Sequence, residues 1–246
     1  MLDKIIKLGI SKREAEELIK VSNNLDEDYE KLLLNYPIQY LIGYVNFYGN
    51  KIYVNNSVLI PRYETEYLIE KTILYCKKIF NKKIKVLDLC TGSGAIGISL
   101  KKELNCDVTI SDISKLALAV ANKNCKENNV NINIIESDLL DNINDKYDLI
   151  ISNPPYINKK MKIMPSVYKY EPHLALFADE EGIYYYRKIF EQIKKNIKEK
   201  FILAFEIGYE QKDTLNSLAK NYFSDCKIFF EKDLNNKYRY LFIISE

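Results

Sequence analysis

The feature that most constrains the fold is an alternation of short apolar segments with longer amphipathic ones, which begins at residue 84. Helical patterns start near Ala95 and extend over 116–128, between runs that are short enough to be strands. Strands and helices that alternate in this way form a largely parallel sheet with helices on both faces. The sequence therefore predicts a doubly wound α/β fold with a seven-stranded sheet, the last two strands forming an antiparallel pair. The strand-like runs are 84–89, one that ends at Asp112, 132–135, 148–152, 201–206, 226–230 and 238–244.

The turn after the first of these strands carries a glycine pattern. Gly92, Gly94 and Gly97 match G-x-G-x-x-G, and Asp112 follows Gly92 by 20 positions, where an acid that binds ribose is expected. The helix after Gly94 favours an anion at its N-terminus, either a pyrophosphate or the carboxylate of a methionine moiety. Asp88 would repel a pyrophosphate but could bind an α-ammonium group, which favours the methionine ligand. A purely structural use of the glycines in a tight turn stays open.

The apolar run at 148–152 ends in Asn153, Pro154, Pro155 and Tyr156. Neither proline can continue a β-ladder, and each biases the residue before it toward extended geometry, so the loop is predicted to be rigid. The Asn153 side-chain oxygen and the Pro154 carbonyl could accept the two protons of a planar NH2 group, with Tyr156 as an aromatic wall. The alternative is an ordinary Asn-Pro turn with a packing tyrosine.

Asp138 and Leu139 follow the predicted strand at 132–135. The carboxyl ends of the strands in a doubly wound sheet face the ligand crevice, so Asp138 is placed to meet an adenine amino group. Leu139 is then placed to pack against the adenine ring. In the alternative interpretation Asp138 is a plain loop acid.

Composition excludes several classes of protein. The 246 residues carry 36 Lys and Arg against 34 Asp and Glu, so the basic excess of a protein that holds nucleic acid through phosphates is missing, although nucleic acid is not excluded. The five cysteines form no Cys-x-x-Cys pair and His173 is the single histidine, which indicates neither a disulfide framework nor a metal site. No apolar run reaches membrane-spanning length. We expect a cytoplasmic, metal-free monomer with no membrane contact.

The N-terminal part has a different pattern. Ser11 opens a capping box and a helix to Val21, Asp26 is predicted to cap a second helix, and Pro37 is predicted to end this helical arm. Alternating residues then predict a β-hairpin with its turn at Gly49-Asn50. The predicted domains are a helical domain at 1–43, a hairpin linker at 44–60 and a catalytic domain at 61–246.

Taken together, the glycine-rich turn, Asp112, Asp138 and the 153–156 loop resemble the class I S-adenosylmethionine-dependent methyltransferases that modify a planar amine nitrogen. Further motifs narrow the resemblance to the HemK/PrmC family. This resemblance extends from about Pro37 to the C-terminus. These motifs are 37–43, 60–62 with 64–66, 170–172 through 175–176 to Gly182, and 206–208 with Gln211.

The resemblance implies an activity, a cofactor and a partner. The family methylates the side-chain amide nitrogen of the glutamine in the Gly-Gly-Gln motif of class 1 peptide-chain release factors, using S-adenosylmethionine, and thereby modulates translation termination. The protein substrate would be the release factor, with no direct contact to nucleic acid. The implied cofactor-binding residues are Asp88, Cys90, Thr91, Gly92, Ser93, Gly94, Asp112, Asp138, Leu139 and Asn153. The implied catalytic loop consists of Asn153, Pro154, Pro155 and Tyr156.

The chain departs from the family pattern at several places. Cys90 stands where the family usually has Gly, Tyr63 where it often has Pro, and Leu139 where an aromatic residue is common. These differences are expected to change the affinity for the cofactor without changing the chemistry. The N-terminal helical arm also looks shorter than is usual in the family.

Two other functions fit some of the same residues. A methyltransferase that modifies adenine or guanine in nucleic acid would share the cofactor motifs and the Asn-Pro-Pro-Tyr chemistry, but it would depend steeply on salt. The near-neutral charge and the lack of a target-recognition domain argue against it. A non-catalytic S-adenosylmethionine-binding module is the other alternative, and the intact Asn153 loop argues against it.

Overall fold

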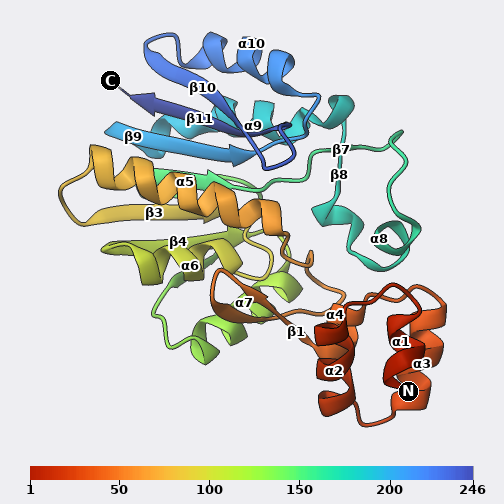
Figure 1. Ribbon diagram of the computed structural model, residues 1–246. Helices are drawn as coiled ribbons and strands as arrows, with labels where there is room; N and C mark the ends of the chain where they lie inside the picture. The colour runs from red at the N-terminus through yellow and green to blue at the C-terminus, as the bar shows by residue number, and fades with distance from the viewer. Residues whose placement is uncertain (246) are drawn as a thin grey trace.

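A seven-stranded sheet forms the centre of the molecule, with the strand order β10-β11-β9-β6-β3-β4-β5 (Figure 1). The computed structural model describes residues 1–245, so Glu246, the end of the predicted catalytic domain, lies outside the described residues. β11 runs antiparallel to both of its neighbours, β10 and β9, and the other neighbouring strands pair in parallel. The predicted doubly wound sheet is confirmed. Its strands are β3 (Ile84–Leu89), β4 (Cys106–Asp112), β5 (Asn133–Glu136), β6 (Tyr147–Ser152), β9 (Ile197–Glu206), β10 (Cys226–Lys232) and β11 (Tyr238–Ser245).

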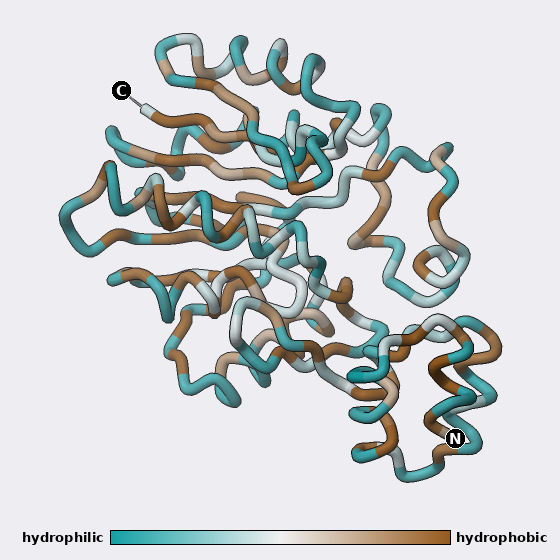
Figure 2. The backbone as a smooth tube through the Cα atoms, in the orientation of Figure 1, coloured by the Kyte–Doolittle hydropathy of each residue, from teal (hydrophilic) through white to brown (hydrophobic). Residues whose placement is uncertain are grey.

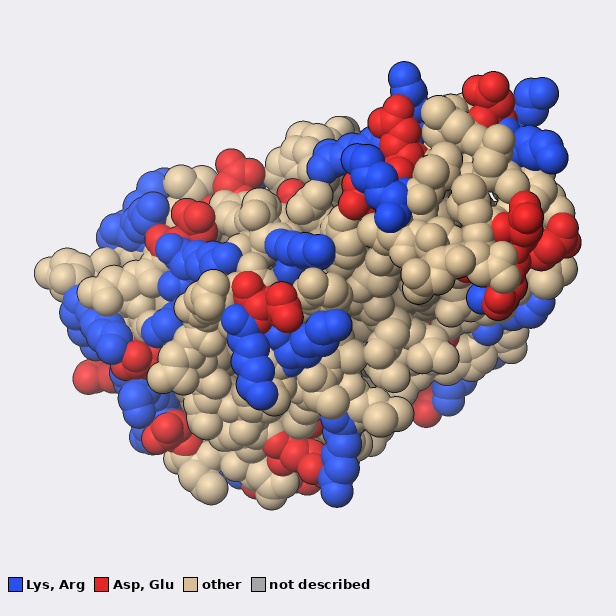
Figure 3. Space-filling model, turned by 90° about the horizontal axis from the view of Figure 1, so that it is seen from below, with Lys and Arg blue, Asp and Glu red and all other residues tan. Residues whose placement is uncertain are grey.

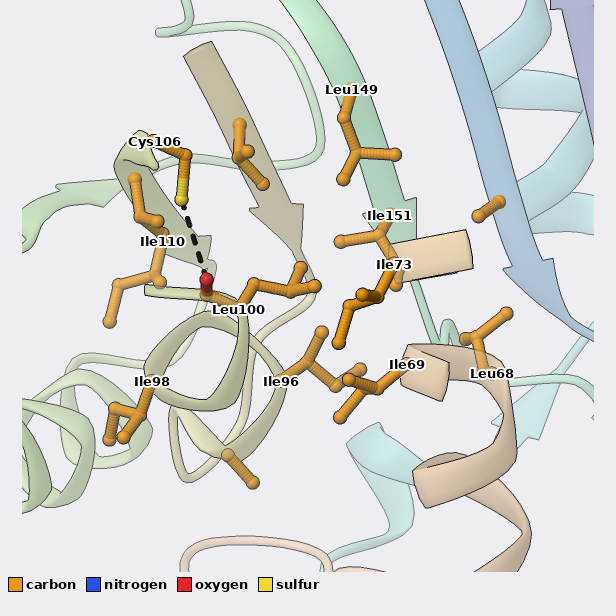
Figure 4. Close-up of a cluster of buried hydrophobic side chains, with 14 of the residues drawn as sticks. Leu68, Ile69, Ile73, Ile96, Ile98, Leu100, Cys106, Ile110, Leu149 and Ile151 are labelled. Atoms are coloured by element: carbon orange, nitrogen blue, oxygen red, sulfur yellow. Dashed lines mark hydrogen bonds between the residues drawn. The ribbon is translucent and has the colours of Figure 1, made fainter. Parts of the chain in front are cut away.

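Helices cover both faces of this sheet because successive side chains of each strand point to opposite faces. In β3, for example, Val86 packs with the helices of one face and Leu87 with those of the other. Figure 2 shows the strands as largely hydrophobic, and Figure 4 shows part of the first core cluster, where the Cys106 thiol donates to the Leu100 carbonyl at 3.5 Å. The first face carries α5 (Tyr63–Ile79), α6 (Ala95–Glu103) and α7 (Lys115–Glu127), and the second carries α9 (Tyr184–Gln192) and α10 (Lys212–Tyr222).

The N-terminal helices form a separate small bundle with its own core, in which Ile5, Ala15, Leu18, Leu32 and Ile38 are buried. The bundle lies at one end of the sheet, below the carboxyl ends of the strands in the view of Figure 1. Because the core of this bundle is small, the bundle buries little apolar surface by itself. The stability of the bundle therefore depends in part on contact with the rest of the chain. The bundle contains α1 (Leu2–Ile6), α2 (Lys12–Val21), α3 (Leu25–Leu33) and α4 (Ile38–Ile42).

Two details of this bundle differ from the sequence-based prediction. Ser11 caps α2 as predicted, but the cap of α3 is Asn24, whose side-chain oxygen accepts from the Glu27 N–H at 3.3 Å, and Asp26 lies inside the first turn. Pro37 does not end the arm, because it is the N-cap of the short helix α4. Helices of five residues such as α1 and α4 are too short to show a periodic pattern, which is why they were not predicted.

The predicted hairpin is present as β1 (Tyr44–Phe47) and β2 (Asn50–Tyr53). Because Phe47 pairs with Asn50, its two-residue turn is Tyr48-Gly49 and not Gly49-Asn50. Both turn residues have positive φ, 47° and 74°, as a type I′ turn requires, and only Gly49 adopts such a φ without steric cost.

One buried asparagine joins this hairpin to the glycine-rich turn. The Asn124 side chain of α7 accepts from the Tyr53 N–H at 2.7 Å and donates to the Tyr53 carbonyl at 2.9 Å. Its second amide proton goes to the Ser93 carbonyl at 2.8 Å. Both protons and the oxygen of the amide are therefore bonded to backbone groups from two separate segments.

Replacing Asn124 with alanine is expected to lower the free energy of unfolding by about 2–4 kcal/mol, because it leaves backbone groups of Tyr53 and Ser93 without these partners in a buried position. Urea denaturation of the purified protein measures this change. Asn122, an exposed residue of the same helix, provides the control, and its alanine variant should stay within about 0.5 kcal/mol of wild type. Equal losses in the two variants would contradict the bonding role of Asn124.

A long insertion follows the 153–156 loop and reaches toward the N-terminal bundle (Figure 1). The Tyr170 hydroxyl donates to the Leu34 carbonyl at 3.0 Å, and the Tyr170 ring meets that of Tyr36 edge-on at 4.9 Å. The insertion thereby links the bundle to the edge of the sheet where the catalytic loop is predicted. It contains β7 (Ile157–Asn158), α8 (Pro165–Tyr170), η1 (His173–Ala175), β8 (Phe177–Ala178) and η2 (Glu180–Gly182), and η3 (Ile193–Lys195) follows α9.

Candidate active site

A cavity of about 250 Å³ lies beyond the carboxyl ends of the central strands. The chain leaves β3 toward β4 and β5 on one side and leaves β6 toward β9 on the other, so the cavity lies at the point where the strand order reverses. The predicted site residues in its lining are Cys90, Thr91, Gly92, Ser93, Asp112, Asp138, Leu139, Asn153 and Pro155.

The glycine-rich turn after β3 forms one wall of this cavity. Cys90, Gly92 and Gly94 have φ values of 59°, 55° and 81°, so three left-handed residues in five bend the chain sharply into α6. The Gly92 N–H donates to Asp112 at 2.9 Å, and the Ser114 N–H donates to the other oxygen of the same carboxylate, also at 2.9 Å. Burial raises the pKa of Asp112, and these backbone bonds oppose the shift. Asp112 thus fixes the turn to the start of α7.

Two predicted cofactor residues lie outside the cavity lining. The Asp88 side chain is fully buried below the turn, where one carboxylate oxygen accepts from the Thr91 hydroxyl and from the Gly97 N–H, the latter at 2.9 Å. Gly94 packs against α7, since a Cβ atom there would lie 3.2 Å from the Ala121 Cβ. In this arrangement Asp88 supports the turn from behind, and its contact with an α-ammonium group stays a prediction.

The buried carboxyl of Asp88 predicts a pH dependence of stability. Burial raises its pKa to about 7, and its second oxygen has no hydrogen-bond partner among the described residues. Because the pKa of Asp88 is higher in the folded state, folding favours its protonated form. The resulting stabilisation is fully present below the pKa of the unfolded chain, near 3.8, and is lost as the pH rises through about 7. Asp88→Asn keeps a neutral side chain at every pH and should remove this loss.

The measurement is the difference in unfolding free energy between wild type and Asp88→Asn, by urea denaturation at pH 5.5 and 8.5. The difference should move in favour of the variant by ~2 kcal/mol between the two pH values. A difference that does not change with pH would show that Asp88 does not titrate in this range.

Polar side chains hold the 153–156 loop in place from below the cavity. The Asn153 amide donates to the Thr65 hydroxyl at 3.3 Å, and that hydroxyl donates to the buried Glu206 carboxylate at 2.6 Å. The Tyr156 hydroxyl donates to the other oxygen of Glu206 at 3.0 Å, and the Gln211 amide donates to the Tyr156 carbonyl at 2.9 Å. The loop is therefore anchored through side chains and backbone together.

This anchoring explains where the predicted loop residues lie. Asn153 and Pro155 line the cavity, whereas Pro154 is buried and the Tyr156 ring packs into the core cluster of the second face. Tyr156 thus points to Glu206, and other aromatic rings, those of Tyr184 and Tyr185, line the cavity.

Sequence reasoning did not assign several residues of this site. Thr65 lines the cavity from the first turn of α5, and Glu206 ends β9 with only 2% of its surface exposed. Arg62 also lines the cavity and forms an ion pair with the buried Glu171 at 2.5 Å, which joins the start of α5 to the insertion. In the sequence, the position of Glu206 as an acid that ends an apolar strand was the available indication of a site role.

The described part of the chain gives no indication of a metal centre or a membrane span. Residues 1–245 contain no group of three or more His, Cys, Asp or Glu side chains that could hold a metal ion. None of their helices is both long and apolar enough to cross a bilayer. His173, the single histidine, is exposed, and its ring packs against Tyr168 and Phe177 outside the cavity.

The sheet order, the glycine-rich turn after β3, the acids after β4 and β5 and the Asn-Pro-Pro-Tyr loop after β6 together define a class I methyltransferase. A family model described as "Methyltransferase small domain" matches residues 70–169. Solved methyltransferases share the fold. Ribosomal protein L11 methylase from Lactobacillus delbrueckii subsp. bulgaricus has a TM-score of 0.57 and 19% identity over 79% of this chain and 86% of that one. The T. thermophilus 16S rRNA N2 G1207 methyltransferase, solved with AdoMet and guanosine, has a TM-score of 0.60 and 14% identity over 82% and 50%.

Curated relatives identify the family within this class. The release factor glutamine methyltransferase of Lactococcus lactis is 39% identical over 233 residues, which cover 94% of this chain and 83% of the relative. That of Flavobacterium psychrophilum is 44% identical over 206 residues, covering 80% and 72%. The chain belongs to the family of release factor glutamine methyltransferases.

Proposed function

We propose that the protein transfers the methyl group of S-adenosylmethionine to the side-chain amide nitrogen of the glutamine in the Gly-Gly-Gln motif of a class 1 release factor, and so modulates translation termination. The observation that carries this proposal is the placement of Asn153 in the same cavity as the glycine-rich turn. No hydrogen bond within residues 1–245 engages the Asn153 side-chain oxygen. This oxygen can therefore accept a proton from a substrate amide.

The residues of the cavity fit S-adenosylmethionine. Carboxylates at the ends of neighbouring strands, Asp112 and Asp138, can accept from ribose hydroxyls and an adenine amino group. Leu139 and Ile113 supply apolar surface for the ring, and the N-terminal turn of α6 favours a carboxylate. Cys90 contributes a thiol to the same wall, and burial together with the nearby Asp112 charge raises its pKa, which keeps the thiol neutral. When bound, the cofactor supplies an electrophilic methyl group on a sulfonium.

The 153–156 loop would compensate for the low reactivity of the glutamine amide. The nitrogen of glutamine is a poor nucleophile because its lone pair is conjugated with the carbonyl. The Asn153 oxygen and the Pro154 carbonyl would each accept one of its protons, which orients the lone pair and stabilises positive charge that develops on nitrogen. A separate base is unnecessary, because a methylated and protonated amide loses its proton readily. The rigid attachment of the loop to Glu206 and Gln211 keeps the acceptors in place.

The test is transfer of labelled methyl from S-adenosylmethionine to a purified release factor. A factor with its Gly-Gly-Gln glutamine changed to alanine and a total-RNA sample serve as comparisons. Label on the intact factor alone supports the proposal, whereas label on RNA would replace it with nucleic-acid methylation. Lys, Arg, Asp and Glu are intermixed on the face seen in Figure 3, which lacks the continuous basic surface expected of a protein that holds RNA through phosphates.

We further propose that the chain acts as a cytoplasmic monomer with a helical domain at 1–43, a hairpin linker at 44–60 and a catalytic domain at 61–246. The separate core of the N-terminal bundle supports this division. Light scattering of the purified protein tests the oligomeric state, and a mass of twice the 28.8 kDa chain would contradict it.

A further inference from the structure

We propose that Thr65 is a positioning residue of the methyl transfer: it fixes the Asn153 amide so that its oxygen, and not its nitrogen, faces the substrate. The inference rests on the proposed function, because it concerns how the acceptor for the glutamine amide is presented. Thr65 and Asn153 are separated by 88 positions in sequence and meet only in the folded chain.

The orientation follows from counting donors and acceptors. Glu206 is buried and accepts two hydrogen bonds, from Thr65 at 2.6 Å and from Tyr156 at 3.0 Å. A threonine hydroxyl has one proton, and this proton is used in the bond to the carboxylate. Toward Asn153 the hydroxyl can therefore only accept.

An asparagine amide has one end that donates and one that accepts, and the two have nearly the same shape. Since Thr65 can only accept, the nitrogen of Asn153 must turn to it, as the contact of 3.3 Å shows. The oxygen then lies at the opposite end, on the side of the cavity. The reversed amide would place two oxygens with no proton between them against each other, and would offer an N–H donor to the NH2 group of glutamine. Such a site could not bind that group.

The buried carboxyl of Glu206 gives this chain of bonds its direction, because it accepts from both Thr65 and Tyr156. Burial raises the pKa of Glu206, while its bonds to Thr65 and Tyr156 and the nearby positive charge of Arg239 act in the opposite direction. Arg239 is held next to the strand end, where its guanidinium donates to the Ile207 carbonyl at 3.1 Å. The Glu206 oxygen that faces Thr65 accepts at 2.6 Å, so the Thr65 proton is directed to Glu206 and not to Asn153.

The backbone of the loop does not depend on Thr65. Gln211 donates to the Tyr156 carbonyl at 2.9 Å, and the Ser152 hydroxyl donates to the Leu89 carbonyl at 2.6 Å, so both ends of the loop have anchors of their own. Loss of the Thr65 hydroxyl should therefore release the amide of Asn153 without moving the loop. The effect of Thr65 on catalysis can thus be separated from an effect on structure.

Thr65→Val keeps the shape of the side chain and removes the hydroxyl. We expect kcat for methylation of the release factor to fall about 10-fold or more, with the dissociation constant for S-adenosylmethionine within about 2-fold of wild type. Thr65→Ser retains the hydroxyl and should restore most of the rate. A matched control is Thr72→Val in the same helix, where a buried hydroxyl donates to the Leu68 carbonyl at 2.7 Å, away from the loop. It should leave kcat unchanged.

A double variant tests whether Thr65 acts through Asn153. Adding Thr65→Val to Asn153→Ala should change kcat by less than about 2-fold, because no amide remains to be oriented. The inference is overturned by a Thr65→Val enzyme with wild-type kcat, by a Thr72→Val enzyme that is equally impaired, or by losses that multiply in the double variant. Absence of transfer by the wild-type enzyme would instead overturn the proposed function, and the inference with it.

Discussion

An Asn153→Ala enzyme is expected to lose about 10²-fold or more of its kcat, because it removes one of the two directed acceptors that orient the glutamine nitrogen and stabilise its developing charge. Single-turnover transfer of labelled methyl to the release factor, at saturating concentrations of both substrates, measures the loss. Binding of the release factor is measured separately, so that a defect in affinity is not counted as a defect in rate.

Asn158 offers a matched control for this variant. It lies in β7 five positions further on, and its side-chain oxygen accepts from the Lys160 N–H at 2.9 Å, outside the cavity. Asn158→Ala should therefore retain the wild-type rate. Wild-type turnover in Asn153→Ala, with substrate binding intact, would remove the loop from the mechanism.

Gly182→Ala is expected to destabilise the protein by about 3 kcal/mol or more and to reduce kcat at the same time. A Cβ atom at Gly182 would lie 2.2 Å from the Tyr156 carbonyl oxygen and 2.3 Å from the Gln211 amide nitrogen, so the loop must move. The φ of +92° adds the strain of a left-handed residue. Urea denaturation and the methyl transfer assay measure the two effects.

Gly9→Ala separates the effect of the steric clash on stability from the effect of the left-handed backbone strain. Gly9 has a similar φ of +84°, and a Cβ atom there would have no other atom within 4 Å. We expect this variant to lose only about 1–2 kcal/mol, from strain alone, and to keep its kcat. Equal losses at the two positions would mean that contact with the loop is unimportant.

Regular elements of the sheet could be predicted because their causes are local. The ends of β3 at Ile84 and Leu89 follow directly from an apolar run that stops at a glycine-rich turn, and the Ser114 cap of α7 follows from the hydroxyl before a helical pattern. The spacing from Gly92 to Asp112 predicted an acid that binds ribose, and in the structure this acid lines the cavity and also accepts from the Gly92 N–H at 2.9 Å. In each case the informative residues are neighbours or lie one βα unit apart.

The supports of the catalytic loop could not be predicted in the same way. Thr65 and Glu206 are 141 positions apart, and nothing in either residue type indicates that the two will pair. The turn at Tyr48-Gly49 escaped prediction because turn preferences favour Gly-Asn, whereas strand pairing decides the register. The burial of Asp88 below the turn could not be predicted either, because it depends on how α6 packs over the sheet.

The hydrogen bonds of the Asn124 side chain to Tyr53 and Ser93 also constrain the order in which segments fold while the chain is being synthesised. The helices of residues 1–43 leave the ribosome before the hairpin, and they have a core of their own that includes Ile5, Leu18 and Leu32. The hairpin that follows cannot complete its bonds at Tyr53 until Asn124 has been made, 71 residues later. The hairpin is therefore translated before α7 but reaches its final position only after α7 has been made.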